Sequence, residues 1–232
     1  MNAMLAPVTT SIGKKALMGV TGVLLVLFVL GHMTGNLLIF AGRDAINEYA
    51  RFLHEAGHGA LIWVARLGLL ALFVTHLALA ILLKQENRKA RPVRYVVEDT
   101  IQASWASRNM LLTGLVIFAF LAYHLAHFTL GLTDPDTFKG AYEPRGKENL
   151  EDVYQMVVRG FQQPLVASIY MLAQLTLCAH LWHGAGSWMQ SLGLNRGKLR
   201  GASKLMGPVI ALVVLAGNSL IVLACLLGIV SV

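Results

Sequence analysis

Five long apolar stretches dominate the chain, at about 16–40, 60–83, 109–132, 164–190 and 205–230. Each reaches the roughly 20 residues that an α-helix needs to cross the hydrocarbon of a bilayer. A spanning segment must be helical, because lipid offers no water to bind free backbone groups. With 56% hydrophobic and 13% charged residues, the chain is too apolar for a soluble domain of its length. We therefore predict an all-α integral membrane protein, with residues 1–232 forming a single membrane domain of five transmembrane helices.

The basic residues divide unequally between the two sets of connecting segments. Residues 1–15, 84–108 and 191–204 contain 12 Lys and Arg against 3 Asp and Glu, whereas the other set contains 7 against 9. Segments rich in Lys and Arg stay on the cytoplasmic side of a membrane. We therefore predict a cytoplasmic N-terminus and a C-terminus outside. The formal net charge of +7 then follows from membrane topology and requires no nucleic-acid partner.

Four of the apolar stretches each contain a deep histidine: His32, His76, His124 and His180. A helix rises about 1.5 Å per residue, so His32 and His124 are expected roughly 25 Å from the cytoplasmic boundary. His76 and His180 lie on helices that run the other way and are expected roughly 12–15 Å from that boundary. The four side chains therefore form an outer pair, His32 with His124, and an inner pair, His76 with His180.

An ionisable side chain inside a membrane is costly, and a functional role is the default interpretation. Neutral imidazole is a good ligand for haem iron, so we expect one haem at each pair. Zinc is disfavoured, because no carboxylate or thiolate is expected at matching depth. His127 and His183 each lie one turn after one of these histidines and remain alternative ligands. Gly184, on the same face as His180, favours His180 because a ring can lie close to a glycine backbone.

Short motifs along residues 10–230 resemble those of a known family. The matching residues are Thr21-Gly22, Gly31-His32-Met33, Ala65-Arg66, His76, Ser107-Arg108-Asn109-Met110, Thr113-Gly114, Tyr123-His124-Leu125, His180, Gly184 and Ser187. In these motifs the chain is similar to the di-haem cytochrome b membrane anchor subunit of succinate:quinone oxidoreductases and quinol:fumarate reductases. Each motif is short, and their order, spacing and topology together carry the resemblance.

The resemblance implies cofactors, partners and a location. The first four helices would form a bundle around two b-type haems, ligated by the outer and the inner histidine pairs. A flavoprotein subunit and an iron–sulfur subunit would bind on the cytoplasmic side of a bacterial inner membrane. The chain would pass electrons between them and a quinone, often menaquinone in this branch of the family.

Two other functions fit the histidines less well. A cytochrome b subunit of another respiratory enzyme, such as a hydrogenase or a formate dehydrogenase, would distribute its ligands differently over its helices. A proton or ion transporter with a histidine relay would be expected to have intramembrane carboxylates and broken helices. None of the five predicted spans contains Asp or Glu.

Polar residues near the two levels are candidates for binding haem propionates, which need cationic or hydrogen-bonding partners. Candidates on the inner side are Lys15, Ser107 and Arg108, with Lys14 and Trp105 as further possibilities. Candidates on the outer side are Arg66 and Asn36. His127 and His183 are expected to bind carbonyls, propionates or quinone.

Quinone reduction consumes two protons, so its site needs an acid or a base nearby. Glu55, between the first two spans on the outer side, is the candidate, with Glu48 and His54 as alternatives. We expect a short helix in the same segment, capped by Asp44. A second short surface helix is expected over 148–160, after an irregular loop at 134–147.

Overall fold

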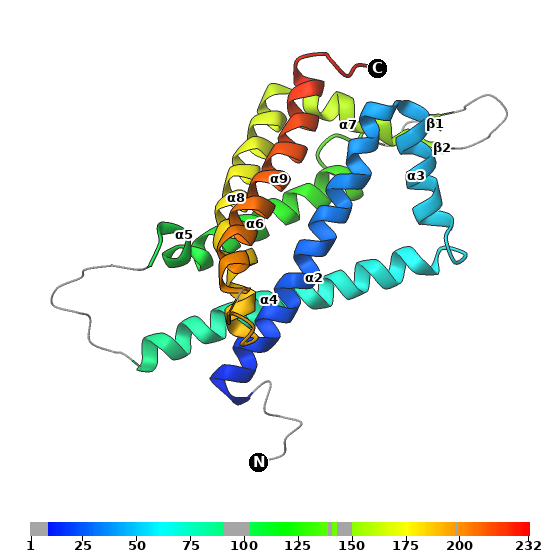
Figure 1. Cartoon of the computed structure of the whole chain (residues 1–232). Helices are drawn as coiled ribbons and strands as arrows, with labels where there is room; N and C mark the ends of the chain where they lie inside the picture. The colour runs from blue at the N-terminus through cyan, green and yellow to red at the C-terminus, as the bar shows by residue number, and fades with distance from the viewer. Residues whose placement is uncertain (1–8, 91–102, 139–140, 143–149, 198) are drawn as a thin grey trace. The chain divides into compact units, whose positions relative to one another are not determined.

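A computed structural model of the chain describes residues 9–90, 103–138, 141–142, 150–197 and 199–232, and these are mostly helical (Figure 1). In chain order the elements are α2 (Ser11–Asn36), η2 (Leu37–Ala41), α3 (Arg43–Glu55), α4 (Ala60–Ala90), α5 (Trp105–Arg108), α6 (Met110–His124), η3 (Leu125–Thr129), β1 (Ala141–Tyr142), β2 (Leu150–Glu151), α7 (Val153–Gln162), α8 (Pro164–Ser191) and α9 (Leu199–Leu226). Element η2 is a 3₁₀-helix and η3 is a single π-helical turn. The two strands form one short antiparallel pair.

Five helical segments of the described chain are long and apolar enough to cross a membrane: Ser11–Ala41, Ala60–Ala90, Met110–Thr129, Pro164–Ser191 and Leu199–Leu226. The predicted all-α membrane fold is thereby confirmed. In each segment, no more than 33% of the 18-residue stretch that is apolar enough to span a membrane is buried within the chain. Exposed apolar faces of this extent would be unstable in water, and a bilayer solvates them.

Several helix ends differ from the predicted ones. Helix α4 continues to Ala90, beyond the predicted end at residue 83, and α9 begins at Leu199 instead of residue 205. Hydropathy marks only the part of a helix that lies in hydrocarbon, and long basic side chains let the helix continue into the polar boundary. The third span ends at Thr129, in the π turn, rather than at residue 132.

The described chain divides into two compact units. The first unit consists of residues 1–28, 68–115 and 178–212, and the second of residues 29–67, 116–177 and 213–232. Each of the five spans contributes residues to both units.

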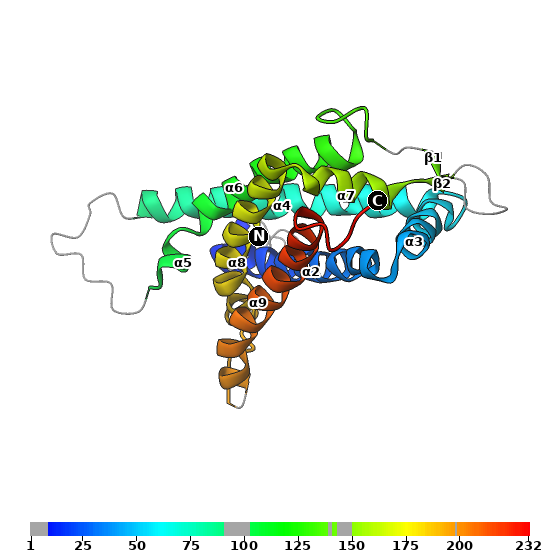
Figure 2. The same cartoon turned by 90° about the horizontal axis from the view of Figure 1, so that it is seen from above.

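In the first unit, helices α8 and α9 approach each other at glycines, and they run alongside each other in both views (Figures 1 and 2). A Cβ atom on Gly207 would lie 2.2 Å from the Trp182 carbonyl oxygen, and one on Gly186 would lie 2.9 Å from the Ser203 carbonyl oxygen. Ser203 and Gly207 are separated by one turn. This is the small-residue spacing that lets membrane helices pack backbone to backbone.

In the second unit, an apolar core is built around α7, the first half of α8 and the end of α9. Its almost fully buried members include Ile39, Val158 and Cys225. Helix α7 therefore packs into the core through Val158 and Phe161, and the prediction of a surface helix was wrong in this respect. Helix α3 contacts η2, α7 and β2 in this unit.

The starts of α3 and α7 also differ from the predictions. Helix α3 begins at Arg43 with Gly42 as its N-cap, at a φ of 105° that suits glycine, and Asp44 lies inside the first turn. Asp44 is therefore not the predicted cap. Helix α7 begins at Val153, later than predicted, because Asp152 caps it by accepting a hydrogen bond from the Gln155 backbone N–H at 3.1 Å. Residues 139–140 and 143–147 of the predicted irregular loop, and residues 148–149 of the predicted helix, lie outside the described residues.

Candidate functional site

The inner pair of histidines lies in the first unit, and each imidazole binds a threonine of another helix. His76 on α4 has its Nδ1 atom 3.1 Å from Thr21 Oγ1 on α2. His180 on α8 has its Nδ1 atom 3.0 Å from Thr113 Oγ1 on α6. The two imidazoles are also close enough to interact electrostatically. The same side-chain pair thus occurs twice within one unit, on four different helices.

The threonine hydroxyls determine which imidazole nitrogen carries the proton. Thr21 Oγ1 donates to the Leu17 carbonyl at 3.0 Å, and Thr113 Oγ1 donates to the Asn109 carbonyl at 3.1 Å. A hydroxyl has one proton, so each of these oxygens accepts from the imidazole Nδ1–H. The Nε2 lone pair of His76 and of His180 is then left for a ligand, in the manner of metal-binding histidines whose second nitrogen is held by the protein.

A glycine follows each of these threonines and lies against the same imidazole. A Cβ atom on Gly22 would lie 3.2 Å from His76 Cε1, and one on Gly114 would lie 3.5 Å from His180 Cε1. The glycine beside the His180 ring is therefore Gly114 of α6. Gly184 does not contact the His180 imidazole, because a Cβ atom there would meet Met110 instead. In both cases the threonine of a Thr-Gly dipeptide binds the imidazole, and the glycine after it leaves space for the ring.

The outer pair of histidines lies in the second unit. The ring centres of His32 on α2 and His124 at the end of α6 are 5.9 Å apart, with the ring planes at 87°. Tyr170 of α8, which is buried, places its hydroxyl 3.3 Å from His124 Nδ1. The outer pair thus also has a hydroxyl partner, and here it is a tyrosine.

His127 occupies a different environment from His124. It lies in the π turn η3 and is 4% exposed. Its Nδ1 atom is 3.1 Å from the Tyr170 hydroxyl, and its ring stacks on Phe128 with ring centres 4.0 Å apart. A Cβ atom on Gly160 would lie 3.3 Å from His127 Nε2, so that nitrogen faces α7. His124, the last residue of α6, is instead the histidine whose ring lies beside a partner imidazole, that of His32.

The sequence contained a signal for Thr21 and Thr113 but none for Tyr170. The two Thr-Gly dipeptides belong to the motifs noted above, although their contact with the histidines was not predicted. Tyr170 was missed because a single tyrosine in an apolar helix is ordinarily a core residue.

The predicted propionate-binding residues lie at the ends of the spans. Lys15 and Arg108 are exposed in the first unit, which also contains the inner histidine pair. Ser107 Oγ donates to the Ser104 carbonyl at 3.0 Å. In the second unit, the Arg66 guanidinium lies 5.2 Å from the centre of the Trp63 ring. Asn36 ends α2 and makes no side-chain cap.

The predicted quinone acid, Glu55, is the last residue of α3 and is exposed. Its carboxylate forms an ion pair with Arg51 at 3.5 Å, one turn earlier in the same helix. The alternatives Glu48 and His54 are also exposed on α3, and His54 Nδ1 lies 2.8 Å from the Ala50 carbonyl oxygen. His183, the alternative to His180, lines a cavity between the end of α8 and the start of α9.

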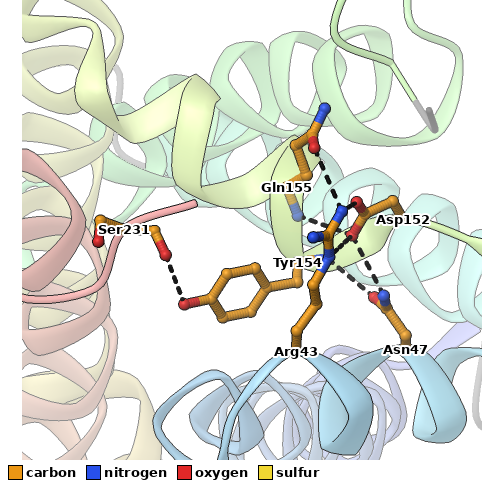
Figure 3. A network of polar contacts seen from close by, with 6 residues as sticks. All are labelled: Arg43, Asn47, Asp152, Tyr154, Gln155 and Ser231. Carbon is orange, nitrogen blue, oxygen red and sulfur yellow. Dashed lines mark hydrogen bonds and ion pairs between the residues drawn. The ribbon is translucent and has the colours of Figure 1, made fainter. Parts of the chain in front are cut away.

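A polar network in the second unit was not predicted from the sequence (Figure 3). Asp152 is 1% exposed and binds the Arg43 guanidinium, with Arg43 Nε 3.3 Å from Asp152 Oδ1. Asn47 donates to the same carboxylate at 3.1 Å and accepts from the Tyr154 backbone N–H at 2.9 Å. The Tyr154 hydroxyl donates to the Ser231 carbonyl at 2.9 Å. This network joins α3, the start of α7 and the C-terminal segment.

The described helices define a polytopic membrane protein with two pairs of intramembrane histidines. Within the described residues, no three His, Cys, Asp or Glu side chains gather as a metal-ion site. In the second unit, the paired imidazoles of His32 and His124 lie with their ring centres 5.9 Å apart. Comparison of the chain with family models, with curated proteins and with solved structures finds no match.

Proposed function

We propose that this chain is the membrane anchor and di-haem cytochrome b subunit of a succinate:quinone oxidoreductase. One observation carries the proposal: His76 and His180 each have Nδ1 within hydrogen-bond distance of a threonine hydroxyl on another helix. With Nδ1 protonated, Nε2 is the nitrogen that would bind a ligand. When bound, each haem iron would take up and release one electron, so two haems would provide an electron path through the membrane. The motifs shared with the di-haem anchor family support the identity of the partner subunits and of the quinone.

The distance between the outer histidines supports the same assignment. Two imidazoles on one iron have ring centres roughly 6 Å apart, since each metal–nitrogen bond is about 2 Å and each ring centre lies about 1 Å further. His32 and His124 have ring centres 5.9 Å apart. The residues that would hold the haems are thus His76 and His180 in the first unit, and His32 and His124 in the second.

Haem content tests the proposal directly. The full chain, purified from membranes in mild detergent, is expected to contain two b-type haems per chain. His76→Ala and His32→Ala are each expected to retain one haem, because each removes one histidine of a different pair that would hold a haem. His54→Ala, an exposed histidine outside the pairs, is the matched control and should retain two. A reduced-minus-oxidised spectrum without a b-type α-band would refute the proposal.

Co-purification separates this function from that of another membrane cytochrome b. A flavoprotein and an iron–sulfur protein are expected to accompany the tagged chain, together with succinate-dependent quinone reduction. Glu55 is proposed to deliver protons to the quinone from the end of α3. A haem-containing chain that instead co-purifies with a hydrogenase or a formate dehydrogenase would overturn the assignment.

Tyr170 is expected to position His124. If His124 binds iron through Nε2, its Nδ1 carries the proton, and the Tyr170 hydroxyl accepts it and donates to His127. Tyr170→Phe is expected to retain both haems and to raise the midpoint potential of the outer haem only, because the ligand becomes less basic. Redox titration followed optically measures this shift. Tyr123→Phe, in the same aromatic cluster, is the control and should leave both potentials unchanged.

A further inference from the structure

A cavity of about 260 Å³ in the first unit opens between the end of α8 and the start of α9. Side chains that can bind an anion line it: Trp182, His183, Gln190, Asn195, Arg200 and Lys204. At about 30 Å³ per water molecule, the cavity has room for roughly eight waters, which is enough for a phosphate group and part of its hydration. Of these six side chains, His183 alone was considered above for the respiratory function.

The cations of this cavity have no carboxylate available to them among the described residues. In the described part of the first unit, Glu86 is the only Asp or Glu. Its carboxylate already forms an ion pair with Lys14. Arg200 and Lys204 therefore line a concave site with a positive charge that the neighbouring described residues do not neutralise. Such a site attracts an anion, and an arginine fork matches phosphate oxygens well.

A buried hydroxyl positions one neutral donor at the same cavity. Ser203 is 5% exposed, and its hydroxyl lies 3.0 Å from Asn195 Oδ1. The same hydroxyl also lies 3.0 Å from the Arg200 carbonyl oxygen, so Ser203 holds the Asn195 side chain beside the first turn of α9. The cavity thus combines two cations with a side-chain amide that is held in place.

The surroundings of the cavity favour a lipid over a free anion. Directly after Lys204, helix α9 has three exposed apolar side chains: Leu205, Val209 and Leu212, which are 67%, 55% and 51% exposed. These positions are spaced i, i+4 and i+7, so they form one apolar row along the helix. Trp182, in the cavity wall, is 45% exposed, and indoles are enriched where helices meet the membrane boundary.

We propose that this cavity binds the phosphate of an anionic phospholipid, with Arg200 and Lys204 on the headgroup and the apolar row of α9 along an acyl chain. Basic pockets between membrane helices commonly bind such headgroups. The proposal is independent of haem binding, because none of the four paired histidines lines the cavity.

Lipid binding by the purified full chain tests the proposal. The affinity for phosphatidylglycerol is measured by native mass spectrometry and by the shift in Tm in detergent. The double variant Arg200→Gln/Lys204→Gln is expected to lose affinity by on the order of tenfold or more, because both charge-assisted contacts are removed. The control Arg88→Gln/Lys89→Gln makes the same change of charge on α4, away from the cavity, and is expected to change affinity less than twofold.

Two other ligands and one conservative variant identify what the cavity binds. Phosphatidylcholine and inorganic phosphate at equal concentration are expected to bind weakly and to leave the Tm unchanged. Lys204→Arg should retain binding, which separates loss of the site from loss of the fold. Equal losses in the cavity variant and the control, or equal stabilisation by inorganic phosphate, would overturn the proposal. It would also be overturned if the cavity variant kept its lipid affinity and lost only a co-purifying soluble subunit.

Discussion

Asp152→Ala is expected to lower the free energy of unfolding by about 2–3 kcal/mol. The substitution removes the helix cap of α7 and leaves the Asn47 amide and the Arg43 guanidinium without their carboxylate. Loss of one partner of a fully buried ion pair would cost more. Here the Arg43 side chain is 36% exposed, so water compensates part of the loss. A thermal or denaturant melt of the full chain in detergent measures the effect.

The pH dependence of stability provides an independent check on Asp152. Burial alone would raise the pKa of this carboxyl, but its hydrogen bonds, led by that from Arg43, hold the pKa below its ordinary value. A group whose pKa is lower in the folded state stabilises the fold above its unfolded pKa of about 4. That contribution is lost as the pH falls through the folded pKa. The difference in Tm between the chain and Asp152→Asn should therefore be present at neutral pH and shrink below about pH 4.

Asp136→Ala is the matched control, since Asp136 is an exposed acid in a turn. Its Tm is expected to stay within the error of that of the unchanged chain. Equal losses of Tm in Asp136→Ala and Asp152→Ala would show that the network around Asp152 contributes nothing specific.

Gly207→Ala is expected to destabilise the fold by about 3 kcal/mol. The added methyl group would lie 2.2 Å from the Trp182 carbonyl oxygen, which belongs to a helix backbone and cannot rotate away. Helices α8 and α9 would have to move apart along the contact between Gly186 and Ser203. A drop in Tm in detergent and increased proteolysis of the segment between these helices would report this separation.

Gly201→Ala on the same helix is the control for Gly207→Ala. A Cβ atom at Gly201 meets nothing within 4 Å. Alanine has the higher helix propensity by about 1 kcal/mol, so this variant is expected to keep or slightly raise the Tm. If the two alanine variants melted alike, close packing of α8 on α9 would not be the basis of stability there.

The membrane helices could be predicted from the sequence because hydropathy over some 20 residues depends on each segment alone. The ends of these helices were predicted less accurately, because a helix can continue beyond the apolar residues that hydropathy detects. Helices α4 and α9 are examples. The pairing of His32 with His124 followed from counting residues along two helices. That count needs only the rise per residue and the direction of each span.

The contacts around the histidines depend on which helices are neighbours, which a single sequence does not reveal. Thr21 lies 55 residues from His76, and Thr113 lies 67 residues from His180. The attempt to choose between His180 and His183 used Gly184, a neighbour in sequence, whereas the relevant glycine lies on another helix. Asp152 was overlooked for the same reason, since its partner Arg43 is 109 residues away.

The π turn at Leu125–Thr129 takes up one extra residue in the third span. Its ladder is one residue wider than that of an α-helix, with the Leu130 N–H donating to the Leu125 carbonyl at 2.9 Å. Removal of one residue here would restore the α ladder and leave the residues after it close to their present register. Removal of one residue from a regular α-helical part of the span would instead rotate everything after it by about 100° around the helix axis. In evolutionary terms, this turn is the place in the span where a single-codon deletion would do the least damage.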